Sequence, residues 1–179
     1  MAKAFIALGA NLGKRQYTLR QAIERIGRLP GTKVEAVADF RQSEAVGGPS
    51  GQPLYLNGAL QISTPLRPPE LLSRLLEIER ELGRDRAREA RHGPRLIDLD
   101  LLLYDQEVLH ESGGNEPAAL LVLPHPRMHL RRFVLEPLAQ IAPEVVHPLL
   151  QCTMRELLAA LPPDHTHPAQ DTQALEGAS

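Results

Sequence analysis

The sequence contains no tryptophan, one cysteine, and only three phenylalanines and three tyrosines. A single thiol, Cys152, excludes an intramolecular disulfide and fits a reducing compartment. No apolar run approaches the ~18 residues that a membrane-spanning helix needs, and no secretory signal precedes the first strand-like run. The net charge is only −2 at pH 7, whereas nucleic-acid binders usually carry a basic footprint. These absences predict a cytoplasmic protein without a membrane span or nucleic-acid partner.

The chain has 179 residues, of which 42% are hydrophobic, so it is long enough for one domain with its own core. Residues 162–179 begin with Pro162-Pro163 and lack apolar periodicity, which predicts a disordered tail. We therefore expect a single domain over residues 1–161, and we expect it to be a monomer.

Apolar residues alternate with period two in some segments and recur at helical spacing in others, in the order strand, helix, strand, strand, helix, strand. This order is typical of the α+β ferredoxin-like βαββαβ core, an antiparallel-rich sheet with helices on one face, here followed by additional helices. The six predicted elements span, in order, residues 4–8, 15–29, 34–40, 55–63, 68–82 and 95–104.

Four further features follow the predicted core. We expect a short strand at 107–109, a flexible insertion at 110–119, and a helix at 133–141 that is interrupted at Pro137. Thr153 and Glu156 form a capping-box pattern that predicts a last helix ending near Leu161.

The run Asp98-Leu99-Asp100, set among aliphatic residues, is the strongest chemical signal. On a strand, Ile97, Leu99, Leu101 and Leu103 would face one side, and the two aspartates with Leu102 the other. Two adjacent carboxylates need a positive partner, and Mg²⁺ is commonly held by one or two carboxylates together with substrate phosphates. Five arginines precede the pair and suit phosphate; they are Arg84, Arg86, Arg88, Arg91 and Arg95. Together these residues predict phosphoryl transfer.

Simpler interpretations remain open. A lone aspartate on a strand is commonly solvated, and Asp85 and Glu89 could pair with the arginines on an ordinary charged surface. A non-catalytic ferredoxin-like module that binds a ligand or RNA, or a transferase with another acceptor, would then be the alternative. A P-loop is excluded, because Gly9 to Lys14 is one residue too short and Arg15 stands where a hydroxyl is required. His125 lacks the further ligands that a zinc site needs.

Four motifs, in this order along the chain, give a specific resemblance to the 6-hydroxymethyl-7,8-dihydropterin pyrophosphokinase family over residues 4 to 161. They are Gly9-Ala10-Asn11-Leu12-Gly13, Tyr55-Leu56-Asn57, Gly93-Pro94-Arg95-x-x-Asp98-Leu99-Asp100, and Pro124-His125-Pro126-x-Met128-x-x-Arg131-x-Phe133. The resemblance implies a ferredoxin-like core and transfer of the β,γ-pyrophosphoryl group of ATP to the pterin hydroxymethyl group, with AMP as the second product.

The resemblance also implies roles for single residues. Asp98 and Asp100 would bind two Mg²⁺ ions, with Arg91 and Arg95 as further catalytic residues, and Asp98 would help to remove the hydroxyl proton. Tyr55 and Phe133 would sandwich the pterin, which Ser43, Val46 and Asn57 would also contact. The nucleotide would meet Glu79, Arg84, Arg86, Arg91, His92, Arg95, Ile97, His125 and Arg131. The arginine loop is one residue longer than in the family, and His92 stands where one family pattern has tryptophan.

Overall fold

A computed structural model describes residues 1–85, 93–112 and 120–163 of the chain. Its centre is a five-stranded sheet in the order β2-β4-β1-β5, and β3 pairs with the first three residues of β4. All of these pairings are antiparallel. The strands are β1 (Ala2–Ala10), β2 (Lys33–Val37), β3 (Arg41–Ser43), β4 (Tyr55–Thr64) and β5 (Asp98–Tyr104). The predicted βαββαβ order is confirmed, with the unpredicted short strand β3 added and β2 ending at Val37 instead of Phe40. β1 lies between β4 and β5.

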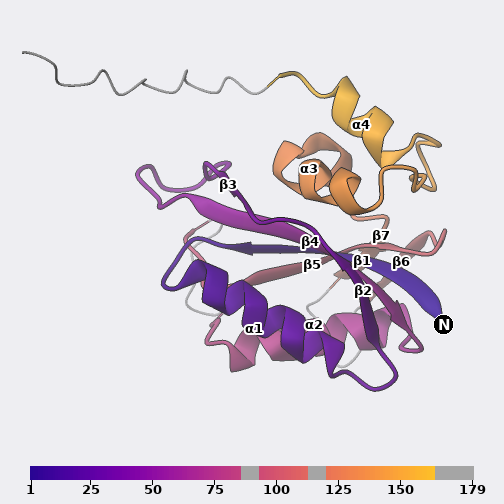
Figure 1. The fold of residues 1–179 in the computed structure, drawn as a ribbon, viewed down its shortest axis with the longest axis horizontal. Coiled ribbons are helices and arrows are strands. Elements are labelled where there is room, and N and C mark those ends of the chain that lie inside the picture. The colour runs from indigo at the N-terminus through magenta and orange to yellow at the C-terminus, as the bar shows by residue number, and fades with distance from the viewer. Residues whose placement is uncertain (86–92, 113–119, 164–179) are drawn as a thin grey trace, which may run out of the picture.

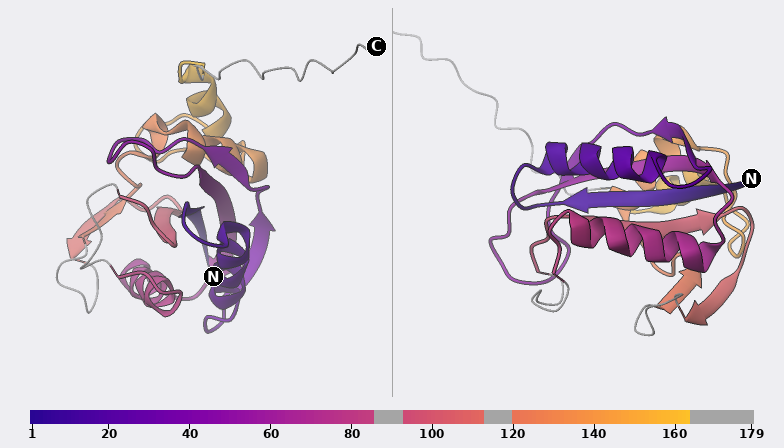
Figure 2. Two further views of the ribbon diagram at one scale, coloured as in Figure 1. Left: turned by 90° about the vertical axis from the view of Figure 1, so that its left-hand side faces the viewer. Right: turned by 90° about the horizontal axis from the view of Figure 1, so that it is seen from below.

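Two helices cover one face of the sheet. These are α1 (Arg15–Gly27) and α2 (Pro68–Glu81), which run side by side, roughly along the strands (Figure 2). Leu19 and Ile26 of α1 and Leu71 and Leu75 of α2 are fully buried against this face. Their spacing is that of an apolar helical stripe, so the hydrophobic pattern alone accounts for this layer.

A second helical layer covers part of the opposite face (Figure 1). It consists of the 3₁₀ turn η1 (Met128–Leu130), α3 (Arg132–Ile141) and α4 (Met154–Ala160). The capping box of Thr153 and Glu156 is confirmed at the start of α4. Contrary to the prediction, Pro137 lies inside a continuous α3. Burial of Leu135 and Leu138 against the sheet offsets the one backbone hydrogen bond that proline removes.

The strand β5 carries an irregularity that the sequence pattern did not reveal. Phe5 pairs with Leu103, but the next residue of β1, Ile6, pairs with Leu101, so Leu102 is an extra residue in the ladder. Leu102 and Leu103 therefore both pack in the core beneath α3, and the prediction that Leu103 shares a face with Leu101 is wrong. Such a bulge resets the alternation of side chains along a strand.

The remaining described elements form a hairpin of β6 (Leu109–Ser112) and β7 (Leu120–Leu123). β6 begins where the short strand at 107–109 was expected to end, whereas β7 was not predicted. Most of the expected insertion and nearly all of the expected tail lie outside the described residues. Among the described helices, none is long and apolar enough to cross a membrane.

Candidate functional site

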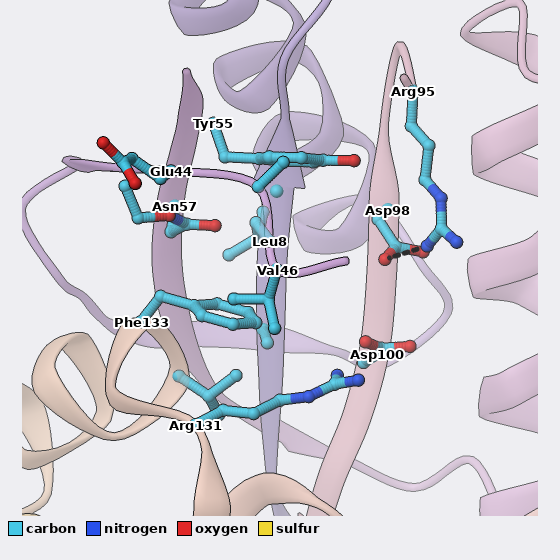
Figure 3. Close-up of a pocket in the computed structure, with 15 residues that line it drawn as sticks. Leu8, Glu44, Val46, Tyr55, Asn57, Arg95, Asp98, Asp100, Arg131 and Phe133 are labelled. Carbon is cyan, nitrogen blue, oxygen red and sulfur yellow. Dashed lines mark hydrogen bonds and ion pairs between the residues drawn. The ribbon is translucent and has the colours of Figure 1, made fainter. Parts of the chain in front are cut away.

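A pocket opens at the end of the sheet where β1, β4 and β5 meet the start of α3 (Figure 3). The cavity measures about 90 Å³. Its lining brings together side chains that the sequence predicted from separate segments: Ser43, Val46, Tyr55, Asn57, Arg95, Asp98, Asp100, Arg131 and Phe133. Gly9, Glu44 and Ala45 line it as well, although no site role was predicted for them.

The floor of the pocket is a row of three residues across neighbouring strands. Gly9 of β1 pairs with Asn57 on one side and with Asp98 on the other. A Cβ atom at Gly9 would lie 3.4 Å from Oδ1 of Asn57 and 3.8 Å from the ring of Tyr55. The absence of a side chain at Gly9 therefore keeps the space between Asn57 and Asp98 open.

Two aromatic rings border the end of the pocket that holds Asn57. Tyr55 and Phe133 approach from opposite sides in Figure 3, and the Tyr55 hydroxyl donates a hydrogen bond to the carbonyl oxygen of Gly93 (3.2 Å). The guanidinium carbon of Arg131 lies 5.6 Å from the centre of the Phe133 ring, in range for a cation–π contact. Aromatic faces placed in this way suit a flat heterocycle.

Polar groups at the same end can fix the orientation of such a ring. The buried Asn57 donates from Nδ2 to Oγ of Ser43 (2.7 Å), and its amide oxygen points into the pocket in Figure 3. Val46 borders the entrance and is 71% exposed. An oriented amide with apolar walls is typical of a small-molecule site.

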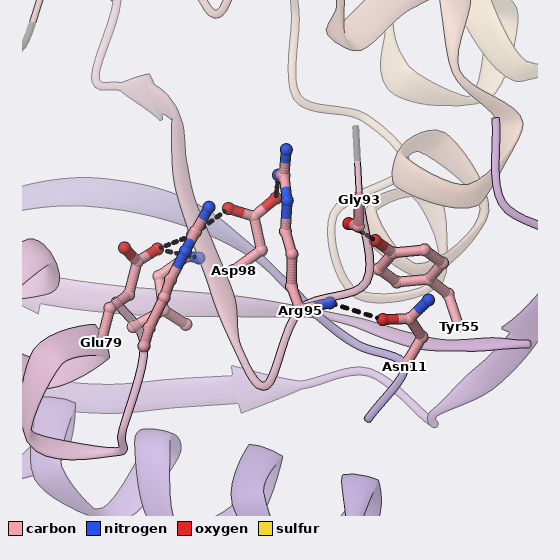
Figure 4. A network of polar contacts seen from close by, with 8 residues as sticks. Asn11, Tyr55, Glu79, Gly93, Arg95 and Asp98 are labelled. Atoms are coloured by element: carbon pink, nitrogen blue, oxygen red, sulfur yellow. Dashed lines mark hydrogen bonds and ion pairs between the residues drawn. The ribbon is translucent and has the colours of Figure 1, made fainter. Parts of the chain in front are cut away.

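The opposite end of the pocket is built around Asp98, whose two oxygens are both held by arginines (Figure 4). Nη1 of Arg84 donates to Oδ1 at 2.6 Å, and Nη1 of Arg95 donates to Oδ2 at 2.8 Å. Arg84 is in turn paired at 2.9 Å with Glu79, which is only 1% exposed. Oε1 of Glu79 also accepts the backbone N–H of Leu99 at 2.7 Å. Glu79 therefore fixes both Arg84 and the beginning of β5.

Asp100 points into the pocket beside Asp98 (Figure 3). Burial, followed by the charges of Asp98 and Glu79, raises the pKa of Asp100 to about 7, although Arg131 and Arg95 act in the opposite direction. A nearby cation would stabilise the charged form of a carboxyl group whose pKa is raised in this way. The two aspartates on one strand face are as predicted.

Asn11 connects the segment before β4 to the segment before β5. Its Oδ1 accepts the backbone N–H of Arg95 at 2.7 Å, while Nδ2 donates to Oε1 of Gln52 and to the carbonyl oxygen of Pro53. The backbone N–H of Asn11 also donates to the carbonyl oxygen of Arg95. Asn11 stands in the first motif, but nothing in its local pattern reveals that it joins segments 41 and 84 residues away.

The other predicted residues take different positions. Ile97 is fully buried in the core beneath the sheet, so only its main chain is placed to meet a ligand. Burial, followed by the charges of Arg131 and Arg127, lowers the pKa of His125 to about 4, which leaves it neutral at pH 7. The predicted residues Arg86, Arg91 and His92 lie outside the described residues.

The donor set fits a hard divalent cation. Within the part of the chain that the structure describes, no cluster of three or more His, Cys, Asp or Glu side chains forms a complete protein cage for a metal. Mg²⁺ does not require one, because it retains waters and shares one or two carboxylates with substrate phosphates. The paired Asp98 and Asp100, and the raised pKa of Asp100, agree with that arrangement.

Comparison with known proteins agrees with this geometry. A family model described as 7,8-dihydro-6-hydroxymethylpterin-pyrophosphokinase matches residues 5–143. A Bacillus subtilis protein named 2-amino-4-hydroxy-6-hydroxymethyldihydropteridine pyrophosphokinase is 43% identical over 142 residues, covering 79% of each chain. A Synechocystis protein of the same name is 40% identical over 155 residues, covering 87% of this chain and 74% of the relative.

A solved structure has the same fold at much lower identity. The Plasmodium falciparum HPPK-DHPS triple mutant superposes with a TM-score of 0.69 at 14% identity, over 88% of this chain. The present chain spans only 44% of that longer chain, so the likeness concerns the fold of one part of it.

Proposed function

Since the chain belongs to the 7,8-dihydro-6-hydroxymethylpterin-pyrophosphokinase family, which transfers pyrophosphate from ATP to 6-hydroxymethyl-7,8-dihydropterin in folate biosynthesis, we propose how its residues divide this task. The supporting observation is the row of Asn57, Gly9 and Asp98 across three strands. It brings a stacking site for a heterocycle next to paired carboxylates in one pocket.

The pterin is held at the end of the pocket that contains Asn57. Tyr55 and Phe133 stack on its two faces, and Asn57 hydrogen-bonds its polar edge, since an amide offers both a donor and an acceptor. Ser43 holds the amide of Asn57 in place, and Val46 covers the entrance. The hydroxymethyl group then points along the row toward Asp98, which is the direction that the reaction requires.

The triphosphate lies at the opposite end. Asp98 and Asp100 would hold two Mg²⁺ ions, which would neutralise charge on the triphosphate. Arg95 and Arg131 line this end of the pocket and present guanidinium groups to phosphate oxygens. His125, neutral at pH 7, provides a hydrogen-bonding group for the nucleotide. Arg84, which pairs with Glu79, holds one oxygen of Asp98 in place.

The chemistry needs positioning more than covalent assistance. The hydroxymethyl oxygen forms a bond to the β-phosphorus as the bond from that phosphorus to the α,β-bridging oxygen breaks, and AMP leaves with that oxygen. Asp98, at the boundary between the two ends, accepts the hydroxyl proton. We also propose that residues 1–161 form the catalytic domain and that the protein is a cytoplasmic monomer. Light scattering of the purified protein would test the monomeric state.

The direct test is AMP formation from ATP, 6-hydroxymethyl-7,8-dihydropterin and Mg²⁺, with a chelator as the control. We expect one AMP per pterin pyrophosphate and no AMP with the chelator. Pterins that lack the hydroxyl group should bind without turnover. Binding of either substrate without AMP formation would support the non-catalytic alternative, and turnover only with another alcohol would support a different acceptor.

A further inference from the structure

The two arginines on Asp98 differ in how firmly they are held. Arg84 has a side chain that is only 4% exposed, and it pairs with both Glu79 and Asp98. Its backbone N–H also donates to the carbonyl oxygen of Glu79 at 3.0 Å. Arg84 is therefore a fixed part of the interior, and moving it would leave the buried carboxylate of Glu79 short of a partner.

Arg95 is held at its main chain and by one side-chain contact, to Asp98. Its backbone exchanges hydrogen bonds with Asn11, whereas its guanidinium group holds Asp98 through Nη1 and is 24% exposed. Nε of Arg95 is buried and has no hydrogen-bond partner among the residues that the structure describes. The side chain lines the pocket (Figure 3), so a turn of the side chain toward an oxyanion there would give this donor a partner.

The charges of the four side chains in this ion-pair network already cancel. Glu79, Arg84, Asp98 and Arg95 alternate in sign, and both oxygens of Asp98 receive hydrogen bonds. A divalent cation arriving alone would have to displace a guanidinium group and leave it without a counter-ion. A cation arriving with a triphosphate supplies that counter-ion, because a guanidinium group binds phosphate as well as carboxylate.

We propose that Arg95 is an exchangeable counter-ion: it occupies Asp98 in the empty protein and passes to the triphosphate when metal and nucleotide bind, while Arg84 and Glu79 stay in place. This rests on the proposed function, in that Asp98 is taken as a metal ligand. Arg95 thereby makes metal binding and nucleotide binding depend on each other, and such a coupling acts equally in both directions.

The test measures Mn²⁺ binding to the full chain without nucleotide, by the electron paramagnetic resonance signal of free Mn²⁺. Arg95→Gln should tighten Mn²⁺ binding about tenfold, the size expected for removing one charge-assisted hydrogen bond that competes for the ligand. Arg127→Gln, which removes a positive charge at an exposed position nearby, should change it less than twofold. In Asp98→Asn, the gain from Arg95→Gln should disappear.

A second measurement addresses the coupling itself. With a non-hydrolysable ATP analogue, the wild type should bind Mn²⁺ more tightly than without it, and Arg95→Gln should show a smaller ratio. Circular dichroism checks that each variant is folded. If Arg95→Gln does not fold, Arg95→Lys replaces it, because its compact ammonium cannot form the planar contact, and its Mn²⁺ affinity should exceed that of the wild type.

The outcomes separate the two proposals. If Asp98→Asn leaves Mn²⁺ binding unchanged, Asp98 is not a metal ligand and the proposed function loses its metal site. If Asp98→Asn weakens Mn²⁺ binding but Arg95→Gln leaves it unchanged, or changes it no more than Arg127→Gln does, the metal site stands and the exchange of Arg95 is overturned.

Discussion

Asn57 and Asp98 lie in one row of the sheet and project into the same pocket, with Gly9 between them. Two strand spacings put their Cα atoms about 10 Å apart. The separation between the proposed pterin end and the proposed phosphate end is therefore set by backbone hydrogen bonds between strands, which vary little, and not by the conformations of loops.

Gly9→Ala should weaken pterin binding about tenfold and leave binding of an ATP analogue within twofold of the wild type. The added Cβ would lie in contact with Asn57, 3.4 Å from its Oδ1, and would fill part of the floor beneath the heterocycle. Isothermal titration calorimetry with each ligand measures both effects. An equal loss for pterin and nucleotide would show instead that the sheet end is distorted.

Phe133→Leu should weaken pterin binding roughly three- to tenfold, because it keeps apolar volume but removes an aromatic face. Tyr55→Phe should change it little, since the ring remains and only the hydrogen bond to Gly93 is lost. Fluorescence or calorimetric titration distinguishes the two variants. A larger effect from Tyr55→Phe than from Phe133→Leu would contradict stacking as the source of affinity.

Asp98→Asn and Asp100→Asn should both reduce turnover to near background, yet they should affect the stability of the metal-free protein in opposite directions. Asp98 is paired with two guanidinium groups, so its loss should cost about 1–3 kcal/mol. Asp100 has a pKa raised to about 7 by burial and neighbouring carboxylates, so its charged form destabilises the fold.

The pH dependence gives the sign of the Asp100 effect. The folded state holds the proton of Asp100 more tightly than the unfolded chain does. Ionisation of Asp100 therefore makes the folded protein less stable as the pH rises from about 4 to 7. Asp100→Asn should therefore stabilise the protein more at pH 8 than at pH 5. Thermal unfolding in a chelator measures this, and a variant less stable than the wild type at pH 8 would refute it.

Glu79→Ala should lower the free energy of unfolding by about 3–5 kcal/mol, because it leaves the buried Arg84 without one of its carboxylates and the N–H of Leu99 without an acceptor. Glu77→Ala is the matched control on the same helix. Glu77 pairs with Arg74, and both side chains are 44% exposed, so its loss should stay within about 0.5 kcal/mol. Urea unfolding compares the two, and similar losses would mean that Glu79 is an ordinary helix residue.

His147 should make the protein sensitive to acid. It is 3% exposed, and its Nδ1 accepts the backbone N–H groups of Leu149 and Leu150, which a protonated ring cannot do. Burial and the nearby His129 lower its pKa, so its contribution is complete above pH 6.5 and is lost as the pH falls toward the folded pKa.

The His147 prediction is tested by thermal unfolding at pH 7.5 and pH 5. His147→Gln should lose stability at pH 7.5 and show a smaller drop on acidification than the wild type. His110→Gln, at an exposed position, should retain the wild-type drop. An unchanged drop in His147→Gln would assign the acid sensitivity to other groups.

The sequence pattern predicted those elements whose faces are set by local periodicity. The stripes of α1 and α2 and the alternation in β4 needed no knowledge of distant residues. It failed at Leu103, whose face is changed by the bulge at Leu102 and so depends on how β5 aligns with β1, and at Pro137, where tertiary packing outweighs a local preference. Both outcomes depend on partners that no sequence window contains.

The site divides in the same way. Residue types and strand alternation indicated Asp98 and Asp100, and the family resemblance implied the aromatic pair, whereas the positions of the arginines depend on the folded chain. Nothing in the spacing shows that Arg84 and Arg95 hold different oxygens of Asp98. Nor does it show that Asn11 joins the segment before β4 to the segment before β5. These contacts depend on side-chain conformations at the meeting point of three strands.

The central position of β1 has a consequence for the order in which the protein is made. β1 is synthesised first, but its partners on either side are β4 and β5, and the β5 ladder is complete only after Tyr104. Contacts between segments so far apart in sequence form slowly. The pocket therefore assembles only after most of the domain has left the ribosome, and nascent chains that end before β5 lack both Asp98 and Asp100.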